Sequence, residues 1–359
     1  MPKTSRKSSA KPSGEPSNSP FVPEVKESEH TPLDLPDWYK NIKNTSQAMK
    51  QLSKRPSSDQ TQALIALQSM KGCMDRCEKE GVTPAQLAKL FEELRDHVHK
   101  AEILLKVDRL VVRKAKMLEE ATGLPRIFAA KRVDFPWDLK ADAFQLYNRW
   151  RMQVFELDIL RGIRARPGTD RGADSIDPTW PYRVSAKFYG EGNLVLGQWW
   201  PTQLTTVRDG AHGSPQAGIF GEKGMGAYSV VLSGTGSSYY NDEDNGNDIW
   251  YSGTDGQNFT PTDNTNRLIE TCDTLHNPVR VLRSHNLPNS NPYRPEVGFR
   301  YDGLYDVVEK KLVHAAKQKY KFHLVRCKGQ FPIRCEDNAA RRPTRFEIAE
   351  DDRLRKSGR

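Results

Sequence analysis

The sequence predicts an α+β protein, in which a region of long helices precedes a mainly β domain built as a barrel or curved sheet. Residues 1–56 are rich in Ser, Pro, Lys and Glu, a composition typical of a disordered N-terminal tail. Residues 57–164 repeat apolar side chains at the helical period. Residues 165–335 change to short β-branched runs between Gly, Pro, Asn and Asp, as strands and turns do. Residues 336–359 are interpreted as a basic C-terminal tail.

The first long helix is predicted from its start and stop signals. Thr83 followed by Pro84 indicates an N-cap with proline at the first helical position. Gly123 and Pro125 indicate where the helix ends. The apolar face between these points consists of Ile103, Leu104, Val107, Leu110, Val111, Met117 and Leu118. A face this broad is expected to be buried.

A second long helix is predicted after Pro136 by the same spacing rule. Its apolar positions are Phe144, Tyr147, Trp150, Val154 and Leu157. Core packing is the ordinary role of such aromatic side chains. Together the two helices indicate an antiparallel bundle, or an extension that docks a partner protein.

Four short β-branched runs predict the strands of the following domain. They occupy residues 228–232, 279–282, 305–308 and 322–325. The segments between them are rich in glycine, asparagine, aspartate and serine, which favour turns. Binding residues are expected on these loops.

The charge distribution favours a polyanionic partner. The chain of 359 residues carries a net charge of +9. Residues 201–300 hold seven Lys or Arg against eleven Asp or Glu, whereas residues 301–359 hold fifteen against nine. Phosphate-neutralising charge should therefore come from the C-terminal part, or from a few well-placed arginines inside the acidic stretch. The proposed phosphate contacts are Lys317, Lys319, Lys321 and Arg326.

The cysteines and the apolar runs argue against several other classes of protein. Five scattered cysteines are typical of a reducing compartment rather than a disulfide framework. Cys73 and Cys77 lie in a helical pattern with no second Cys/His pair at finger spacing, so no zinc module is expected. No cofactor or metal is predicted. No apolar run is long enough to span a membrane, and residues 2–7 precede no signal-like stretch, so we expect neither a membrane nor a secreted protein.

Three segments of the β domain occur in a characteristic order. Residues 217–234 contain AGIFG and GAYSVVLSG, and residues 239–253 form an aromatic and acidic loop. Residues 278–305 begin with PVRV and end with GFRYDGLY. Together these segments resemble the SRA-YDG (SET- and RING-associated) domain family over roughly residues 197–330. The Tyr301-Asp302-Gly303 motif is expected to be structural, as a turn with a buried tyrosine and a capping carboxylate.

The resemblance implies an SRA-like (PUA-like) domain that flips 5-methylcytosine out of duplex DNA and does no chemistry on it. By position it assigns stacking on the flipped base to Tyr239 and Tyr251. It assigns to Asp242 the carboxylate that accepts from the cytosine amino group and repels the O4 of thymine. The remaining positions of the 5-methylcytosine pocket are the small residues Ser233, Gly234 and Ser252.

The sequence departs from this family at the pocket and at the groove contact. Residues 235–238 are four extra residues before Tyr239, so Tyr240 is an alternative stacking residue. Gln216 stands where well-known relatives carry a small apolar wedge that enters the minor groove. A glutamine can fill a vacated base position and form hydrogen bonds there. Gln216 is therefore assigned to the DNA groove together with Ala217 and Gly218.

A third departure concerns the strand opposite the flipped base. Residues 253–271 are much fewer than in the relatives that read hemimethylated DNA. Their long basic finger, which contacts the other strand from the major groove, has no counterpart of similar length here. Preference for hemimethylated over fully methylated DNA is therefore not expected.

These observations favour a nuclear DNA-binding protein that recognises methylated cytosine by base flipping, linked to chromatin and DNA methylation. Its partners would be duplex DNA with modified cytosine and a chromatin protein that docks on the helical region. The alternative is a scaffold of a ubiquitin-ligase-related or other chromatin enzyme complex whose SRA-like domain has reduced DNA binding. An enzyme is not predicted, because neither the eight Cys/His ligands of a RING nor a nuclease cluster is evident.

Overall fold

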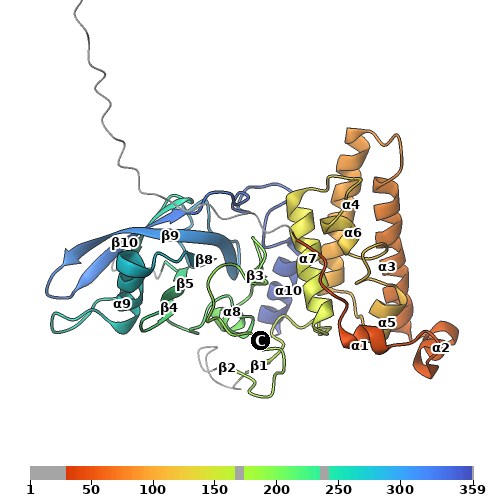
Figure 1. Cartoon of the computed structure of the whole chain (residues 1–359), viewed down its shortest axis with the longest axis horizontal. Helices are drawn as coiled ribbons and strands as arrows, with labels where there is room; N and C mark the ends of the chain where they lie inside the picture. The colour runs from red at the N-terminus through yellow and green to blue at the C-terminus, as the bar shows by residue number, and fades with distance from the viewer. Residues whose placement is uncertain (1–29, 166–173, 235–241, 358–359) are drawn as a thin grey trace, which may run out of the picture.

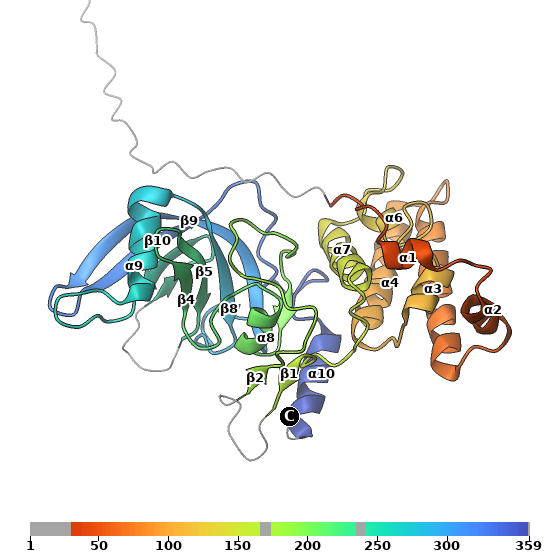
Figure 2. The same cartoon turned by 60° about the horizontal axis from the view of Figure 1, so that its bottom comes forward.

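The computed structural model describes residues 30–165, 174–234 and 242–357. Helices occupy one half of the molecule and a large sheet occupies the other (Figures 1 and 2). The first half contains α1 (Asp37–Asn41), α2 (Gln47–Lys54), α3 (Ser58–Cys77), α4 (Pro84–Ile103), α5 (Arg109–Lys114), α6 (Pro125–Phe128) and α7 (Trp137–Arg151). The described part of the predicted N-terminal tail thus includes two short helices, α1 and α2.

The predicted start of the first long helix is confirmed, but its predicted end is wrong. The Thr83 hydroxyl accepts from the Gln86 N–H at 3.3 Å, and the Thr83 N–H donates to the Gln86 side chain at 2.9 Å. The helix ends at Ile103 rather than near Gly123, and Leu104 is exposed. Asp108 then begins α5, because its carboxylate accepts from the Val111 N–H at 2.8 Å. A side-chain cap of this kind starts a new helix at a point where the apolar periodicity alone predicts that the first helix continues.

The second long helix is also shorter than its apolar pattern. Helix α7 ends at Arg151, so Val154 and Leu157 lie beyond it. Gln153 adopts a left-handed φ of 61°, and the Val154 N–H donates to the Arg149 carbonyl at 3.0 Å. A left-handed residue that closes the last carbonyls in this way terminates a helix. Val154 is nevertheless buried, which explains why it continues the apolar pattern.

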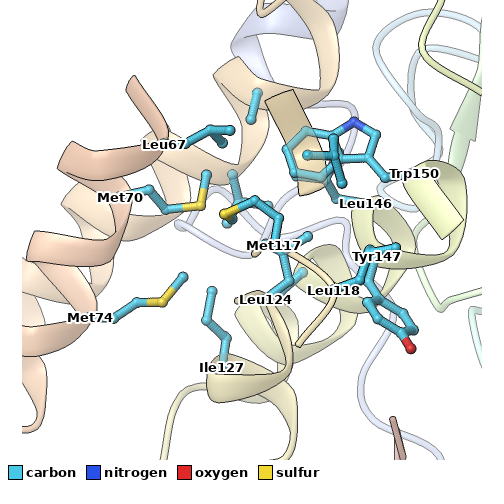
Figure 3. Close-up of a cluster of buried hydrophobic side chains, with 14 of the residues drawn as sticks. Leu67, Met70, Met74, Met117, Leu118, Leu124, Ile127, Leu146, Tyr147 and Trp150 are labelled. Atoms are coloured by element: carbon cyan, nitrogen blue, oxygen red, sulfur yellow. The ribbon is translucent and has the colours of Figure 1, made fainter. Parts of the chain in front are cut away.

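The core of the helical half lies between α3, α4 and α7, with α3 against α4 and α4 against α7. Figure 3 shows methionine side chains from α3 facing Met117, with aromatic side chains of α7 on the other side. The labelled side chains are all at most 2% exposed: Leu67, Met70, Met74, Met117, Leu118, Leu124, Ile127, Leu146, Tyr147 and Trp150. These helices form a single packed bundle.

The sheet of the second half is open. Its strands are β3 (Trp199–Trp200), β4 (Ile219–Glu222), β5 (Gly226–Leu232), β6 (Glu243–Asp244), β7 (Asp248–Ser252), β8 (Val279–Ser284), β9 (Phe299–His314) and β10 (Lys319–Arg326). Their order is β4-β5-β8-β9-β10-β7-β6, and β3 pairs with β9. Within the described ranges the edge strands β4 and β6 do not pair with each other, so the sheet is not a closed barrel; of the two predicted forms, the barrel is wrong and the curved sheet remains. All four β-branched runs lie in strands, as predicted.

Short elements surround this sheet. They are β1 (Ile163–Arg164), β2 (Ser175–Ile176), α8 (Gln203–Arg208), α9 (Asp263–Glu270), the π-helix η2 (Thr271–Leu275) and α10 (Arg345–Lys356). Helix α9 packs on β4 and β5, and η2 packs on β5 and β9. Strands β9 and β10 form a long hairpin that lies beside α9 and far from the helical bundle α1–α7 (Figures 1 and 2).

The Tyr301-Asp302-Gly303 motif lies inside β9 and is not a turn. Asp302 is fully buried, and its carboxylate accepts from Arg283 at 2.9 Å and from Arg300 at 2.6 Å. Gly303 has a φ of 110°, and a Cβ there would lie 2.4 Å from the Gln330 side-chain oxygen. The motif therefore supports the sheet through a buried ion pair and a close approach that excludes a side chain.

The two halves are joined by a buried charge cluster around Asp142 of α7. Its carboxylate accepts from Arg334 at 2.6 Å and from Arg342 at 2.8 Å, and it contacts His99 Nε2 at 2.7 Å. Burial raises the pKa of Asp142, but the two guanidinium groups outweigh burial and hold that pKa well below its usual range. Helix α10 follows Arg342 and packs on α4 between the halves (Figure 1). The C-terminal segment interpreted as a tail is therefore largely part of the fold.

Candidate nucleic-acid interface

Two of the segments that carry the family resemblance, residues 217–234 and the described part of residues 239–253, meet because the sheet curls. Strands β5 and β7 are not neighbours in the sheet, yet the Tyr251 hydroxyl of β7 lies 3.5 Å from the Val231 carbonyl of β5. Gly218 lies at the same point, since its carbonyl accepts from the Val231 N–H at 2.7 Å. A Cβ on Gly218 would lie 2.6 Å from the Tyr251 hydroxyl. The close approach of these three segments thus requires glycine at 218.

Asp242 lies beside the end of β7. Its Oδ1 accepts from the Ser252 N–H at 2.7 Å, which fixes the orientation of the carboxylate. Burial raises the pKa of Asp242, and the Ser252 N–H acts in the opposite direction. Ser252 and Tyr251 are both buried, at 4% and 5% exposure. Three of the predicted pocket residues are therefore adjacent in space.

The segment that carries Asp242 is anchored two residues later. The Asp244 carboxylate accepts from Arg283 twice, at 2.8 and 2.7 Å, and from the Asn291 side chain at 2.9 Å. Burial raises the pKa of Asp244, but Arg283 outweighs burial and lowers it. Arg283 also pairs with Asp302 of β9. Arg283 was not among the predicted site residues, since its sequence position gives no sign that it supports the acidic loop.

Two other predicted pocket residues lie at the end of β5. Ser233 and Gly234 directly follow this strand and are half-buried. A Cβ on Gly234 would lie 2.9 Å from the Pro288 ring and 3.1 Å from the Asn286 carbonyl. The backbone there is packed against the loop after β8. Tyr239 and its alternative Tyr240 lie outside the described residues, as do the extra residues 235–238.

The predicted groove contacts, residues 216–218, lie on a loop that hydrogen bonds from neighbouring side chains hold in place. Gln216 is exposed, whereas Ala217 and Gly218 are half-buried. The Ala217 carbonyl accepts from His212 Nε2 at 2.8 Å and from the Gln203 side chain at 2.9 Å. Burial lowers the pKa of His212 to about 4, so this imidazole is neutral at pH 7 and its Nε2 must carry the proton. The loop is thus held in place beneath the exposed Gln216.

The four proposed phosphate contacts differ in accessibility. Lys317 and Lys319 approach Asp255 at 3.0 and 3.6 Å, and Lys321 approaches Glu243 at 2.8 Å. These lysines lie on the β9–β10 hairpin or its turn. Arg326 is buried and donates to the Asp302 carbonyl at 3.1 Å and to the Phe331 carbonyl at 2.7 Å. Arg326 is therefore excluded from the proposed contacts, because its donors are used inside the fold.

The arginines of the acidic stretch are also mostly internal. Five of its seven basic residues are buried: Arg208, Arg267, Arg280, Arg283 and Arg300. Arg280 donates to the carbonyls of Ala186 at 2.7 Å and Phe188 at 2.5 Å, and burial lowers its pKa to about 10. Well-placed arginines within residues 201–300 are therefore not a source of phosphate contacts, apart from Arg294.

The described residues contain neither a metal-binding cluster nor a membrane-spanning helix. Within residues 30–165, 174–234 and 242–357, no group of three or more His, Cys, Asp or Glu side chains is arranged to hold a metal ion. None of the helices in the described part of the chain has both the length and the apolar character needed to cross a membrane.

The open sheet and the residues around Asp242 lie within one region of the chain that matches a known domain family. Residues 189–330 match the family model of the SAD/SRA domain. The chain therefore contains an SAD/SRA domain, as the sequence resemblance predicted.

Curated relatives share this domain. The E3 ubiquitin-protein ligase ORTHRUS 2 of Arabidopsis thaliana is 33% identical over 153 residues, which are 38% of this chain and 23% of the relative. A UHRF1-like protein of Cryptococcus neoformans is 35% identical over 136 residues, 33% of this chain and 38% of the relative. The chain thus spans well under half the length of these relatives.

Solved structures are similar to part of this chain. A complex of the SUVH5 SRA domain with hemimethylated CG DNA is 29% identical, with a TM-score of 0.30, over 38% of this chain and 90% of that chain. The modification-dependent TagI restriction endonuclease is 30% identical, with a TM-score of 0.34, over 40% of this chain and 53% of that chain.

Proposed function

We propose that this chain binds duplex DNA and holds one methylated cytosine, flipped out of the helix, beside Asp242, Tyr251 and Ser252. The observation that carries this proposal is the fixed carboxylate of Asp242, which lies next to a buried tyrosine. The match of residues 189–330 to the SAD/SRA domain supports the same function.

The chemistry of the site matches cytosine. With Oδ1 of Asp242 bound to the Ser252 N–H, the second oxygen is available in this proposal to accept from the cytosine N4 amino group. Thymine has a carbonyl at that position, which a carboxylate repels. Flipping costs a few kcal/mol, and stacking against an aromatic ring recovers about 1–3 kcal/mol of it. Tyr251 supplies one ring in this proposal, and Tyr239 or Tyr240 supplies the other.

The position of the DNA follows from the loops around this site. Gln216 would enter the groove beside the vacated base, with the backbone of Ala217 and Gly218 against the duplex. The lysines Lys317, Lys319 and Lys321 would contact phosphates from the hairpin side, and each would exchange its carboxylate partner for a phosphate.

We further propose a nuclear protein of chromatin and DNA methylation that acts as a reader and not as an enzyme. The E3 ligases among its relatives match this chain only across the SAD/SRA region. The helical bundle would then dock a chromatin protein, and the SAD/SRA domain would supply the DNA contact.

The test is DNA binding by the full chain to three duplexes that differ at one CG site: unmodified, methylated on one strand, and methylated on both. The expected result is a preference for methylated over unmodified DNA of about ten-fold or more, as a pocket that accommodates one methyl group gives. Equal affinity for all three duplexes would contradict the proposal.

A further inference from the structure

A second site lies at the junction of the two halves, away from Asp242. A cavity of about 470 Å³ is bounded on one side by α7 and on the other by the segment that precedes β3. Aromatic side chains of Trp180, Tyr182, Phe188 and Tyr189 form much of its wall. This volume is in the range of pockets that bury a small molecule, and domain junctions are frequent places for such pockets.

Three polar atoms at this cavity are buried without a hydrogen-bond partner among the described residues. They are the side-chain oxygen of Gln145, the side-chain nitrogen of Asn148 and Nε of Arg161. Gln145 and Asn148 are three residues apart on α7, so they lie on one face of the helix. A buried polar group without a partner costs about 1–3 kcal/mol. Three of them around one cavity indicate that an occupant supplies the missing partners.

The charges of the wall favour an anionic occupant. Both carboxylates are already engaged. Glu102 accepts from the Gln145 amide at 2.6 Å, and Asp209 accepts from Arg208 at 2.7 and 2.6 Å. The Arg149 guanidinium donates to backbone carbonyls, including that of Glu102 at 2.6 Å.

Arg161 is the arginine at this wall whose donors are least occupied, since its Nε has no partner among the described residues. Its nearest carboxylate oxygen, of Asp209, lies 3.9 Å away, and its other contact is the Asp158 carbonyl at 3.4 Å. Arg161 and Asn148 thus offer two unused donors, and Gln145 offers one unused acceptor.

We propose that this cavity binds a small aromatic carboxylate. The carboxylate accepts from Arg161 Nε and from the Asn148 amide, the ring lies among the aromatic side chains around Trp180, and a ring N–H donates to Gln145. This arrangement satisfies the three unpaired atoms and places a negative charge beside Arg161. It is independent of DNA binding at Asp242.

The experiment uses the full chain and three compounds with the same indole ring: indole-2-carboxylate, its neutral carboxamide, and the cationic 2-(aminomethyl)indole. Ligand-observed NMR and calorimetry measure their binding. The carboxylate is expected to bind at least about ten-fold more tightly than the amide, as a charge-assisted hydrogen bond to Arg161 requires. Binding of the cation that equals or exceeds that of the carboxylate would overturn the proposal.

Two variants test whether the compound binds in this cavity. Asn148→Leu removes an unpaired buried donor, so it should weaken carboxylate binding by about ten-fold while leaving the thermal midpoint unchanged or higher. Arg161→Gln should weaken binding at least as much, whereas Arg164→Gln, an exposed arginine three residues away, should not.

The remaining outcomes decide against the site. Absence of carboxylate binding at millimolar concentration, or binding that both Asn148→Leu and Arg161→Gln leave intact, would show that the cavity holds water only. Methylcytosine binding by the same variants reports separately on the function proposed for Asp242.

Discussion

Asp242→Asn should convert the base preference of the site rather than merely weaken it. The Ser252 N–H donates to Oδ1 at 2.7 Å and needs an oxygen there, so the asparagine amide must place its oxygen at this position. Its NH₂ group then points where the second carboxylate oxygen was. That group faces the N4 amino group of cytosine with donor against donor, but it can donate to the O4 of thymine.

The expected loss for methylcytosine is about 1–3 kcal/mol, which is one good base contact. This loss corresponds to a decrease in affinity of roughly 5- to 150-fold. Competition anisotropy should compare duplexes with methylcytosine or thymine opposite the same guanine. The ratio of variant to wild type for each duplex cancels the cost of flipping that base. Thymine affinity should stay constant or rise.

The matched control is Glu243→Gln, because Glu243 is adjacent and exposed and forms an ion pair with Lys321. It should leave the base preference unchanged. Unchanged methylcytosine affinity in Asp242→Asn, or an equal loss in Glu243→Gln, would refute the assignment of Asp242.

The same carboxylate predicts a pH dependence. Burial raises the pKa of Asp242, so its acceptor form disappears at a higher pH than for an ordinary aspartate, whose pKa is about 3.9. Methylcytosine affinity should therefore fall as the pH is lowered through this raised pKa. Asp242→Asn, which does not titrate, should lack this decrease. A decrease of the same size in both proteins would assign it to another group.

Three further predictions concern stability, salt and strand preference. Asp142→Ala should lower the free energy of unfolding in urea by about 3–5 kcal/mol, since it leaves Arg334 buried without a carboxylate and leaves Arg342 with Glu347 alone. The exposed Asp134→Ala should change it by less than about 0.5 kcal/mol, and similar losses in both would refute the argument. Replacing Lys317, Lys319 and Lys321 by glutamine should reduce the slope of log affinity against log salt by about 0.9 for each phosphate that is no longer neutralised, and an unchanged slope would exclude these lysines as phosphate ligands. Hemi- and fully methylated duplexes should bind within about three-fold of each other once the second site is counted. A strong hemimethylated preference would show that another loop, such as residues 286–293, contacts the second strand.

The sequence predicted the elements of the fold better than their limits. The Thr83 cap and all four β-branched runs are where they were expected, because both signals are local. The long helix through Gly123 was not confirmed, because the cap at Asp108 interrupts it. Whether the sheet closes depends on the partners of its edge strands, and strand patterning contains no information on this.

The structure tests the placement of the predicted site residues, not their role. The family resemblance named Asp242, Tyr251 and Ser252 as pocket residues, and the structure brings these three side by side. The support of this site by Arg283 was missed, since it depends on a contact with Asp244 across 39 residues of sequence. A contact at this range follows from the curvature of the sheet, and no local motif encodes it.

Counting charges along the sequence does not show which of them are available for a phosphate contact. Arg283 and Arg300 count as available positive charge in an acidic stretch of the sequence, but both are buried against Asp302. A guanidinium sequestered in the core with its carboxylate contributes almost no potential at the surface, because the pair is nearly neutral as seen from outside. In the proposed complex, the potential at the DNA would be set by the exposed charges that remain, chiefly the hairpin lysines and the acidic residues beside them. For the proposed DNA binding, the charges to compare are therefore exposed pairs such as Lys321 and Glu243, not the totals for whole segments.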